Sequence, residues 1–155
     1  MAHDSISVTR HVEFEAAHML SGYDGGCGSL HGHSYKLEVT LACSESERLK
    51  HNFGFVMDFK NLNRILKDNV PDHMFMYDET QGPDTPEGQI VKILKDNGLR
   101  TWAFPGSPSA ENMSGVLART IQSAIDREFP GSGMLVTKLK LWETTNSYAI
   151  WTLTE

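Results

Sequence analysis

Two runs of alternating apolar residues constrain the fold more than any other feature of this sequence. The first run covers residues 6–18 and the second covers residues 33–43. In an extended chain, side chains at alternate positions share one face. The apolar positions are Ile6, Val8, Val12, Phe14 and Ala16 in the first run, and Tyr35, Leu37, Val39, Leu41 and Cys43 in the second. We therefore predict two half-buried β-strands, joined by the glycine-rich loop SGYDGGCGS.

Three later segments have the spacing of amphipathic helices, and two strands close the chain. The first helix is expected to begin after Asp58, a good capping residue, and to end before Pro71. The second covers residues 86–98, and the third opens at SPSAEN and ends at PGSG. The closing strands are MLVTKLKLWE and SYAIWTLT. This order predicts a single α+β domain, with helices on one face of an antiparallel sheet.

Composition and charge argue against several classes of protein. The 155 residues suit one domain, and the apolar share of 39% is ordinary for a globular protein. A net charge of −6 disfavours nucleic acid or an anionic membrane as the main partner. No segment approaches the roughly 20 apolar residues of a membrane span. Two cysteines without a disulfide framework, and no apolar signal region, predict a soluble protein of the cytoplasm.

Three histidines extend the apolar parity of the first two strands. His18 ends the first run, while His31 and His33 precede the second, so all three are expected to point toward the apolar face. Three neutral imidazoles around Zn²⁺ leave one coordination position open, which is the arrangement of catalytic zinc. The alternative is that these are ordinary buried or surface histidines, because H-x-H is a short and common pattern.

Cys27, Asp72 and His73 are candidates for proton transfer. Cys27 lies in the glycine-rich loop, where a thiol near a metal or a protonated histidine can be held as a thiolate. The alternative is a small, half-buried loop residue. Asp72 could fix the tautomer of His73 and raise its basicity, or it could simply cap a turn beside an exposed histidine. Cys43 continues the strand parity and is expected only to pack.

Glu143 follows Leu135, Leu139 and Leu141 on the inward parity of its strand. An unpaired carboxylate is costly on a buried face. Glu143 therefore either lies in solvent at the end of the strand or accepts hydrogen bonds from something buried. Its two oxygens would suit a ligand with two adjacent N–H donors, such as the guanidine-like edge of a heterocycle.

Together, these motifs resemble the 6-pyruvoyltetrahydropterin synthase family. The matching motifs are FEAAH at 14–18, CGSLHGHSY at 27–35, VMDF at 56–59, PDH at 71–73 and WET at 142–144. Within the family, the spacing C-x-x-x-H-G-H resembles the bacterial branch that forms 6-carboxy-5,6,7,8-tetrahydropterin in the queuosine pathway.

The resemblance implies a T-fold, in which two main helices cover one face of a four-stranded antiparallel sheet. In the family, such sheets join into trimeric barrels, usually paired as hexamers, and the active sites lie at subunit interfaces. A homo-oligomer also suits a small open sheet, whose edges need protection.

The resemblance also implies roles for individual residues. The zinc ligands would be His18, His31 and His33, the catalytic residues Cys27, Asp72 and His73, and the substrate-binding residues Glu143 and Ser109. Ser109 lies in PSAEN, where the family usually has Pro-Thr-Ser-Glu, so it could contact the ligand or cap the helix. The implied substrate is 7,8-dihydroneopterin triphosphate. Residues 81–104 have no counterpart in compact bacterial members and form an insertion with its own short helix, which could cover the site or alter the packing of subunits.

Several reactions fit this resemblance. The leading interpretation is a zinc-dependent lyase that forms 6-carboxytetrahydropterin and releases acetaldehyde and triphosphate. Elimination of triphosphate to give 6-pyruvoyltetrahydropterin is an alternative, as is side-chain cleavage of dihydroneopterin toward folate precursors. Outside the enzymes, a pterin- or purine-binding module with structural zinc is the competing interpretation.

Overall fold

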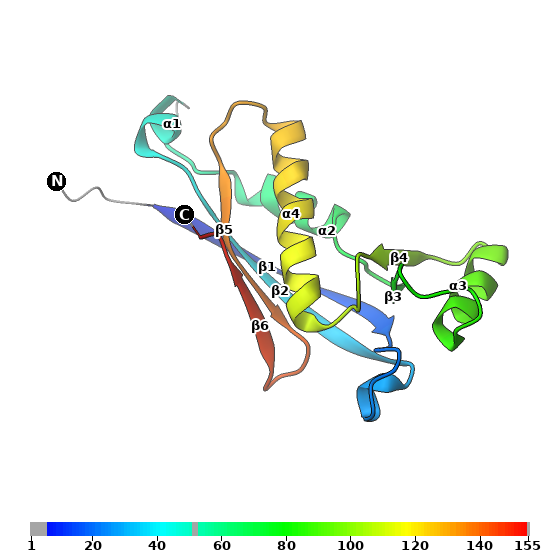
Figure 1. The fold of residues 1–155 in the computed structure, drawn as a ribbon. Coiled ribbons are helices and arrows are strands. Elements are labelled where there is room, and N and C mark those ends of the chain that lie inside the picture. Colours follow the sequence, from blue (N-terminus) through cyan, green and yellow to red (C-terminus); the bar gives the residue numbers. More distant parts are fainter. Residues whose placement is uncertain (1–5, 51–52, 155) are drawn as a thin grey trace.

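The strands of the protein form one twisted sheet, with helices packed over one of its faces (Figure 1). The computed structural model describes residues 6–50 and 53–154. In spatial order, the strands are β4 (Thr101–Phe104), β3 (Met74–Asp78), β1 (Ser7–His18), β2 (His31–Ala42), β5 (Leu135–Trp142) and β6 (Tyr148–Thr152). The helices are α1 (Glu45–Lys50), α2 (Phe59–Asp68), α3 (Pro86–Asp96) and α4 (Ala110–Glu128), and Gly26–Gly28 form a 3-10 turn. No helix in the two described ranges is both long and apolar enough to cross a membrane.

β1 and β2 pair antiparallel along their whole length, which confirms the two strands predicted from the alternating runs. Burial alternates along both strands, so that Phe14 and Leu37 are almost fully enclosed while their neighbours remain accessible. The register places His18, the last residue of β1, opposite His31, the first residue of β2. The histidines therefore lie at the end of the sheet at which this strand pair is joined by its loop.

Helices α2 and α4 pack on the buried face of the sheet, as predicted. The Asp58 side chain caps α2 by accepting a hydrogen bond from the Lys60 amide at 2.6 Å. The Ser109 hydroxyl accepts one from the Asn112 amide at the start of α4. The core between the helices and the sheet includes Phe14, Tyr35, Leu37, Leu62, Ile65, Met113, Leu117, Ile121 and Leu139.

Among the described residues, the sheet has six strands and is mixed, so the prediction of a four-stranded antiparallel sheet was wrong in both respects. β3 pairs parallel with β1 and with β4. Both added strands are only four or five residues long, too short for a clear alternation of apolar and polar residues. A parallel pair needs a long crossover, usually a helix, and α3 provides it. The short helix predicted within residues 81–104 is confirmed, whereas the status of this segment as an insertion stays a prediction.

The expectation that Leu135 lies on the inward face was also wrong. Leu135 is 48% exposed, whereas its neighbour Val136 is 1% exposed. The register between β2 and β5 shifts at this point. Thr40 faces Lys138, but the next residue, Leu41, faces Val136. One extra residue on β5 reverses the parity of all positions before it. Glu143 follows the shift and keeps its predicted parity.

Candidate functional site

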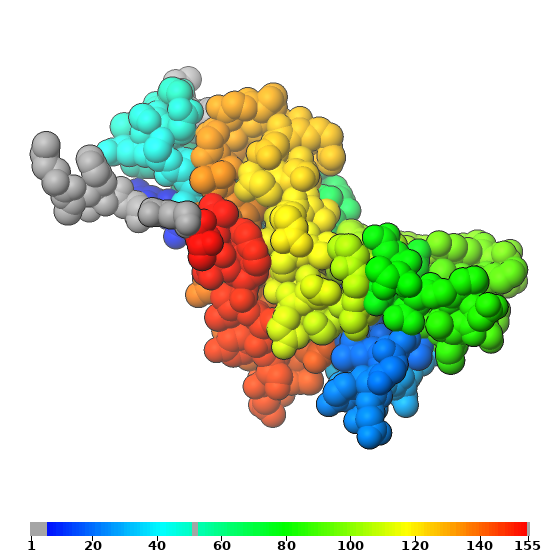
Figure 2. Space-filling model, viewed as in Figure 1, coloured from blue at the N-terminus to red at the C-terminus, as the bar shows by residue number. Residues whose placement is uncertain are grey.

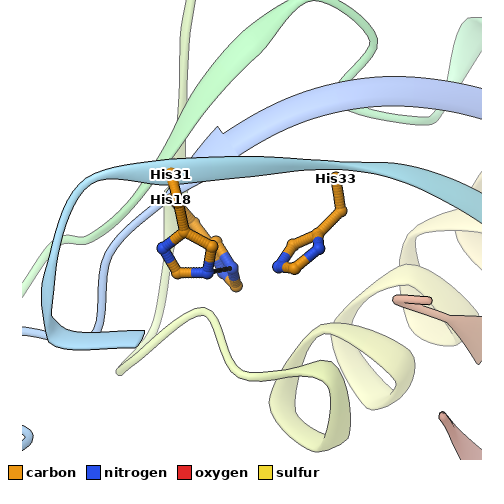
Figure 3. Close-up of side chains that lie close together, drawn as sticks. All are labelled: His18, His31 and His33. Carbon is orange, nitrogen blue, oxygen red and sulfur yellow. Dashed lines mark hydrogen bonds between the residues drawn. The ribbon is translucent and has the colours of Figure 1, made fainter. Parts of the chain in front are cut away.

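The three predicted histidines meet at one end of the buried face of the sheet (Figure 3). His18 comes from β1, and His31 and His33 come from β2. One nitrogen from each ring can be chosen so that all three atoms lie within 4.8 Å of one another. Gly32 lies between the two histidines of β2. A larger residue would not fit here without a shift of the backbone, because a Cβ atom would lie 2.9 Å from the Ala16 carbonyl oxygen on β1. The H-G-H motif therefore allows the close strand pairing that brings the rings together.

Backbone carbonyl groups orient two of the rings. His18 Nδ1 lies 2.8 Å from the Pro108 oxygen, and His31 Nδ1 lies 2.7 Å from the Ser29 oxygen. A carbonyl oxygen can only accept a hydrogen bond, so both Nδ1 atoms must carry the proton. Each Nε2 atom of a neutral ring then presents a lone pair to the cluster, as histidine ligands of metal ions do.

The nitrogen atoms of the cluster fit a bound metal ion. The Nε2 atoms of His18 and His31 are 3.1 Å apart, and two lone pairs at this distance need a cation or a shared proton between them. His33 Nε2 is buried and has no hydrogen-bond partner among the described residues. Burial is the main cause that lowers the pKa values of His18 and His33, which disfavours a proton at these two rings. Three neutral imidazoles suit zinc, copper, iron or nickel.

Glu143 borders the histidine cluster. One of its carboxylate oxygens lies 3.6 Å from His18 Nε2 and 3.7 Å from His33 Nε2. The side chain is 24% exposed, so it lies between the cluster and the surface. A carboxylate in this position can complete the coordination of an ion or accept N–H groups of a ligand bound beside the histidines.

Cys27, Ser109 and Glu143 line one cavity of about 170 Å³, so the structure brings together three of the predicted residues. Cys27 is exposed, and its loop is closed where the Leu20 amide donates to the Cys27 carbonyl at 2.8 Å. The remaining lining residues are Leu20, Ala110, Glu111, Ser147, Tyr148 and Ala149. A thiol, a helix N-terminus and a carboxylate thus face the same space beside the histidines.

The Asp72–His73 pair lies at the turn before β3, where His73 lines a second cavity, of about 460 Å³, together with His33 of the cluster. Asp72 Oδ1 accepts a hydrogen bond from the Glu15 amide at 3.0 Å and lies 3.0 Å from His73 Nδ1. The Glu15 hydrogen bond is the largest influence on the Asp72 carboxyl, whose pKa is lowered. His73 is 73% exposed and has a φ of +54°, uncommon for a residue with a side chain. Within residues 6–50 and 53–154, no hydrogen bond or ion pair joins Asp72 or His73 to Cys27 or to the histidine cluster.

Tyr35 is a polar neighbour of the cluster that sequence reasoning treated only as a core residue. Its ring is fully buried, and its hydroxyl lies 3.4 Å from His18 Nε2. Burial raises the pKa of the phenol, so Tyr35 keeps its proton. The sequence did indicate this contact, because Tyr35 shares the inward parity of His31 and His33. A buried tyrosine hydroxyl usually needs a polar partner. The Pro108 and Ser29 carbonyls left no signal, because any residue type has such a group.

Comparison with solved structures defines the class of fold. A solved structure of 6-pyruvoyl tetrahydropterin synthase from Plasmodium falciparum superimposes with a TM-score of 0.66 at 18% identity, covering 95% of this chain and 96% of the other. The protein therefore has the fold of these synthases, with the histidine cluster at the end of its first two strands.

Comparison of sequences gives the family. The sequence model of the family described as 6-pyruvoyl tetrahydropterin synthase matches residues 7–153 of this chain. A 6-carboxy-5,6,7,8-tetrahydropterin synthase from Haemophilus influenzae is 31% identical over 144 residues, covering 91% of this chain and 94% of the relative. A protein of the same name from Rickettsia bellii is 34% identical over 146 residues, covering 92% and 97%. The chain belongs to the 6-pyruvoyl tetrahydropterin synthase family, which confirms the resemblance.

Proposed function

We propose that the protein is a zinc-dependent lyase that converts 7,8-dihydroneopterin triphosphate and water into 6-carboxy-5,6,7,8-tetrahydropterin, acetaldehyde and triphosphate. The observation that carries this proposal is the three-histidine cluster beside a cavity lined by Cys27 and Glu143. The names of the curated relatives support the product. The reaction would serve queuosine synthesis in the cytoplasm.

His18, His31 and His33 would hold the zinc ion. When bound, the ion would act as a Lewis acid for the oxygens of the substrate side chain. The carbonyl groups of Pro108 and Ser29 keep the Nδ1 protons in place, so that the ring nitrogens facing the cluster remain free to bind.

Glu143 would anchor the pterin. A carboxylate with two oxygens suits the 2-amino group and the N3–H of the pterin ring. Ser109 lines the same cavity and could add a contact. Anchoring the ring fixes the distance from the ring to the substrate side chain, which would place the reacting carbons beside the histidines.

Cys27 would take up a proton from the substrate side chain, and His73 would move a second proton with its orientation set by Asp72. Among the described residues of one chain, no hydrogen bond or ion pair joins this pair to Cys27 or to the histidine cluster. We therefore propose a homo-oligomer, a trimer or hexamer, in which Asp72 and His73 of one subunit complete the site of another. A cavity of about 170 Å³ is smaller than the pockets of roughly 300–1,000 Å³ that usually hold a small ligand, as expected of a partial site.

Formation of 6-pyruvoyltetrahydropterin is the second candidate, because the solved relative that shares the fold carries that name. Product analysis by mass spectrometry separates the two reactions. Acetaldehyde and 6-carboxytetrahydropterin support the first, and triphosphate release without acetaldehyde supports the second. Binding of a pterin without turnover would overturn both and indicate a binding module with structural metal.

A further inference from the structure

Residues 81–104 contact the start of the loop that carries Cys27. Met19, directly after His18, is buried in a small apolar cluster separate from the main core. The members of this cluster are Met19, Phe75 and Val91, with Ala17, Tyr77, Ile90 and Leu94 partly buried around them. Since three of these side chains come from α3, this helix packs beside the histidine end of β1. Figure 2 shows residues of the glycine-rich loop, in blue, directly against the green segment.

Glu87 adds a polar link at the same place. This residue lies in the first turn of α3, and its side chain is fully buried. Its carboxylate accepts a hydrogen bond from the Ser21 hydroxyl and another from the Asp78 amide at 2.9 Å. A buried carboxylate is strongly destabilising unless it is hydrogen-bonded, so the Ser21 hydroxyl is a partner that Glu87 requires.

Ser21 belongs to the base of the Cys27 loop. Its neighbour Leu20 donates its amide proton to the Cys27 carbonyl, and the Leu20 carbonyl accepts from the Tyr23 amide at 3.0 Å. A constraint on Ser21 is therefore transmitted over one residue to the backbone of Cys27. Residues 22–27 of this loop are exposed, so the hydrogen bond between Glu87 and Ser21 restrains the loop from outside, in addition to the hydrogen bonds within the loop.

We propose that Glu87 is a positioning residue, which holds the Cys27 loop through Ser21 in the geometry needed for turnover. The proposal rests on the proposed function, because it takes Cys27 as the reactive thiol. It assigns residues 81–104 a specific task, bracing the loop from outside the site.

A double-mutant cycle tests this proposal, using Ser21→Ala, Glu87→Gln and the double variant of the full-length protein. We expect hydrogen exchange to be faster in peptides covering residues 19–30, and kcat to fall about tenfold or more since small misplacements of reacting groups are costly. KM and zinc content should stay close to those of the wild type. The double variant should be no worse than the more affected single variant, because both changes remove one contact. Ser21→Thr, which keeps the hydroxyl, should restore exchange and kcat.

Glu79→Gln is the matched control, because this carboxylate lies two residues before the segment and is exposed; it should behave as the wild type. Unchanged exchange and kcat in Ser21→Ala would overturn the proposal, as would additive effects in the cycle. If Glu87→Gln fails to fold, Ser21→Ala and Ser21→Thr decide, because they change only the loop side of the contact. If the wild type turns over no pterin, the proposed function fails, and the exchange measurements still decide whether Glu87 holds the loop.

Discussion

His18 and His31 face each other across β1 and β2, with their Nε2 atoms 3.1 Å apart and each Nδ1 atom bonded to a backbone carbonyl. Both rings are thereby oriented before any ion binds. Preorganised ligands lose little freedom on binding, so the fold itself favours metal at this position.

Replacing a histidine and replacing the cysteine should have different effects on metal content. His31→Ala removes one of the three proposed nitrogen ligands, and we expect the variant to lose most of its zinc and its turnover. Cys27→Ala should keep zinc, because the thiol lies outside the cluster, while kcat falls by about a hundredfold or more since a positioned proton-transfer group contributes that much. Elemental analysis of the purified variants checks this. Full zinc content in His31→Ala would refute the ligand assignment.

Glu143→Gln should separate substrate anchoring from metal binding. The change keeps the size of the side chain but removes its charge and one acceptor. We expect zinc to be retained and pterin affinity to fall by about 10- to 100-fold, the range for one hydrogen bond to a charged group. Calorimetric titration with a pterin and metal analysis of the same sample provide the test. Loss of zinc would instead identify Glu143 as a fourth ligand.

Mixing two inactive variants should restore activity if the site is shared between subunits. Cys27→Ala and His73→Ala each remove one side of the proposed site. After subunit exchange in an equal mixture, random pairing in a symmetric oligomer leaves about a quarter of the sites with both residues intact. We therefore expect about a quarter of the wild-type rate. A mixture that stays inactive after proven exchange would show that Asp72 and His73 do not complete a neighbouring site.

The stability of the metal-free protein should fall in mild acid. Burial lowers the pKa values of His18 and His33 from the ordinary value of 6.5, so the unfolded chain binds more protons than the folded one. The free energy of unfolding therefore rises as the pH increases through mild acid, and it reaches its full value above about pH 6.5. Urea unfolding between pH 5 and 7.5 measures the change. His33→Asn should reduce the pH dependence, and an equal dependence in both proteins would contradict the assignment.

Local patterns predicted the parts of this protein that depend on neighbouring residues. Alternation placed His18, His31 and His33 on the buried face, and Asp58 and Pro71 marked the limits of α2. The same reasoning failed where a distant pairing intervened. Leu135 turns outward because of a shift opposite Thr40 and Leu41, which no pattern within β5 encodes.

The sequence by itself determined which residues share a face and which residue types are available for chemistry, since backbone geometry makes side-chain direction periodic. Only the tertiary structure decided which of them meet. It added β3 and β4 to the sheet, brought Cys27 to Glu143, and placed His73 at a second cavity, which His33 also lines. It also joined Glu87 to Ser21, 66 positions apart in the chain. Such contacts depend on how distant segments pack, and local periodicity carries no information about that packing.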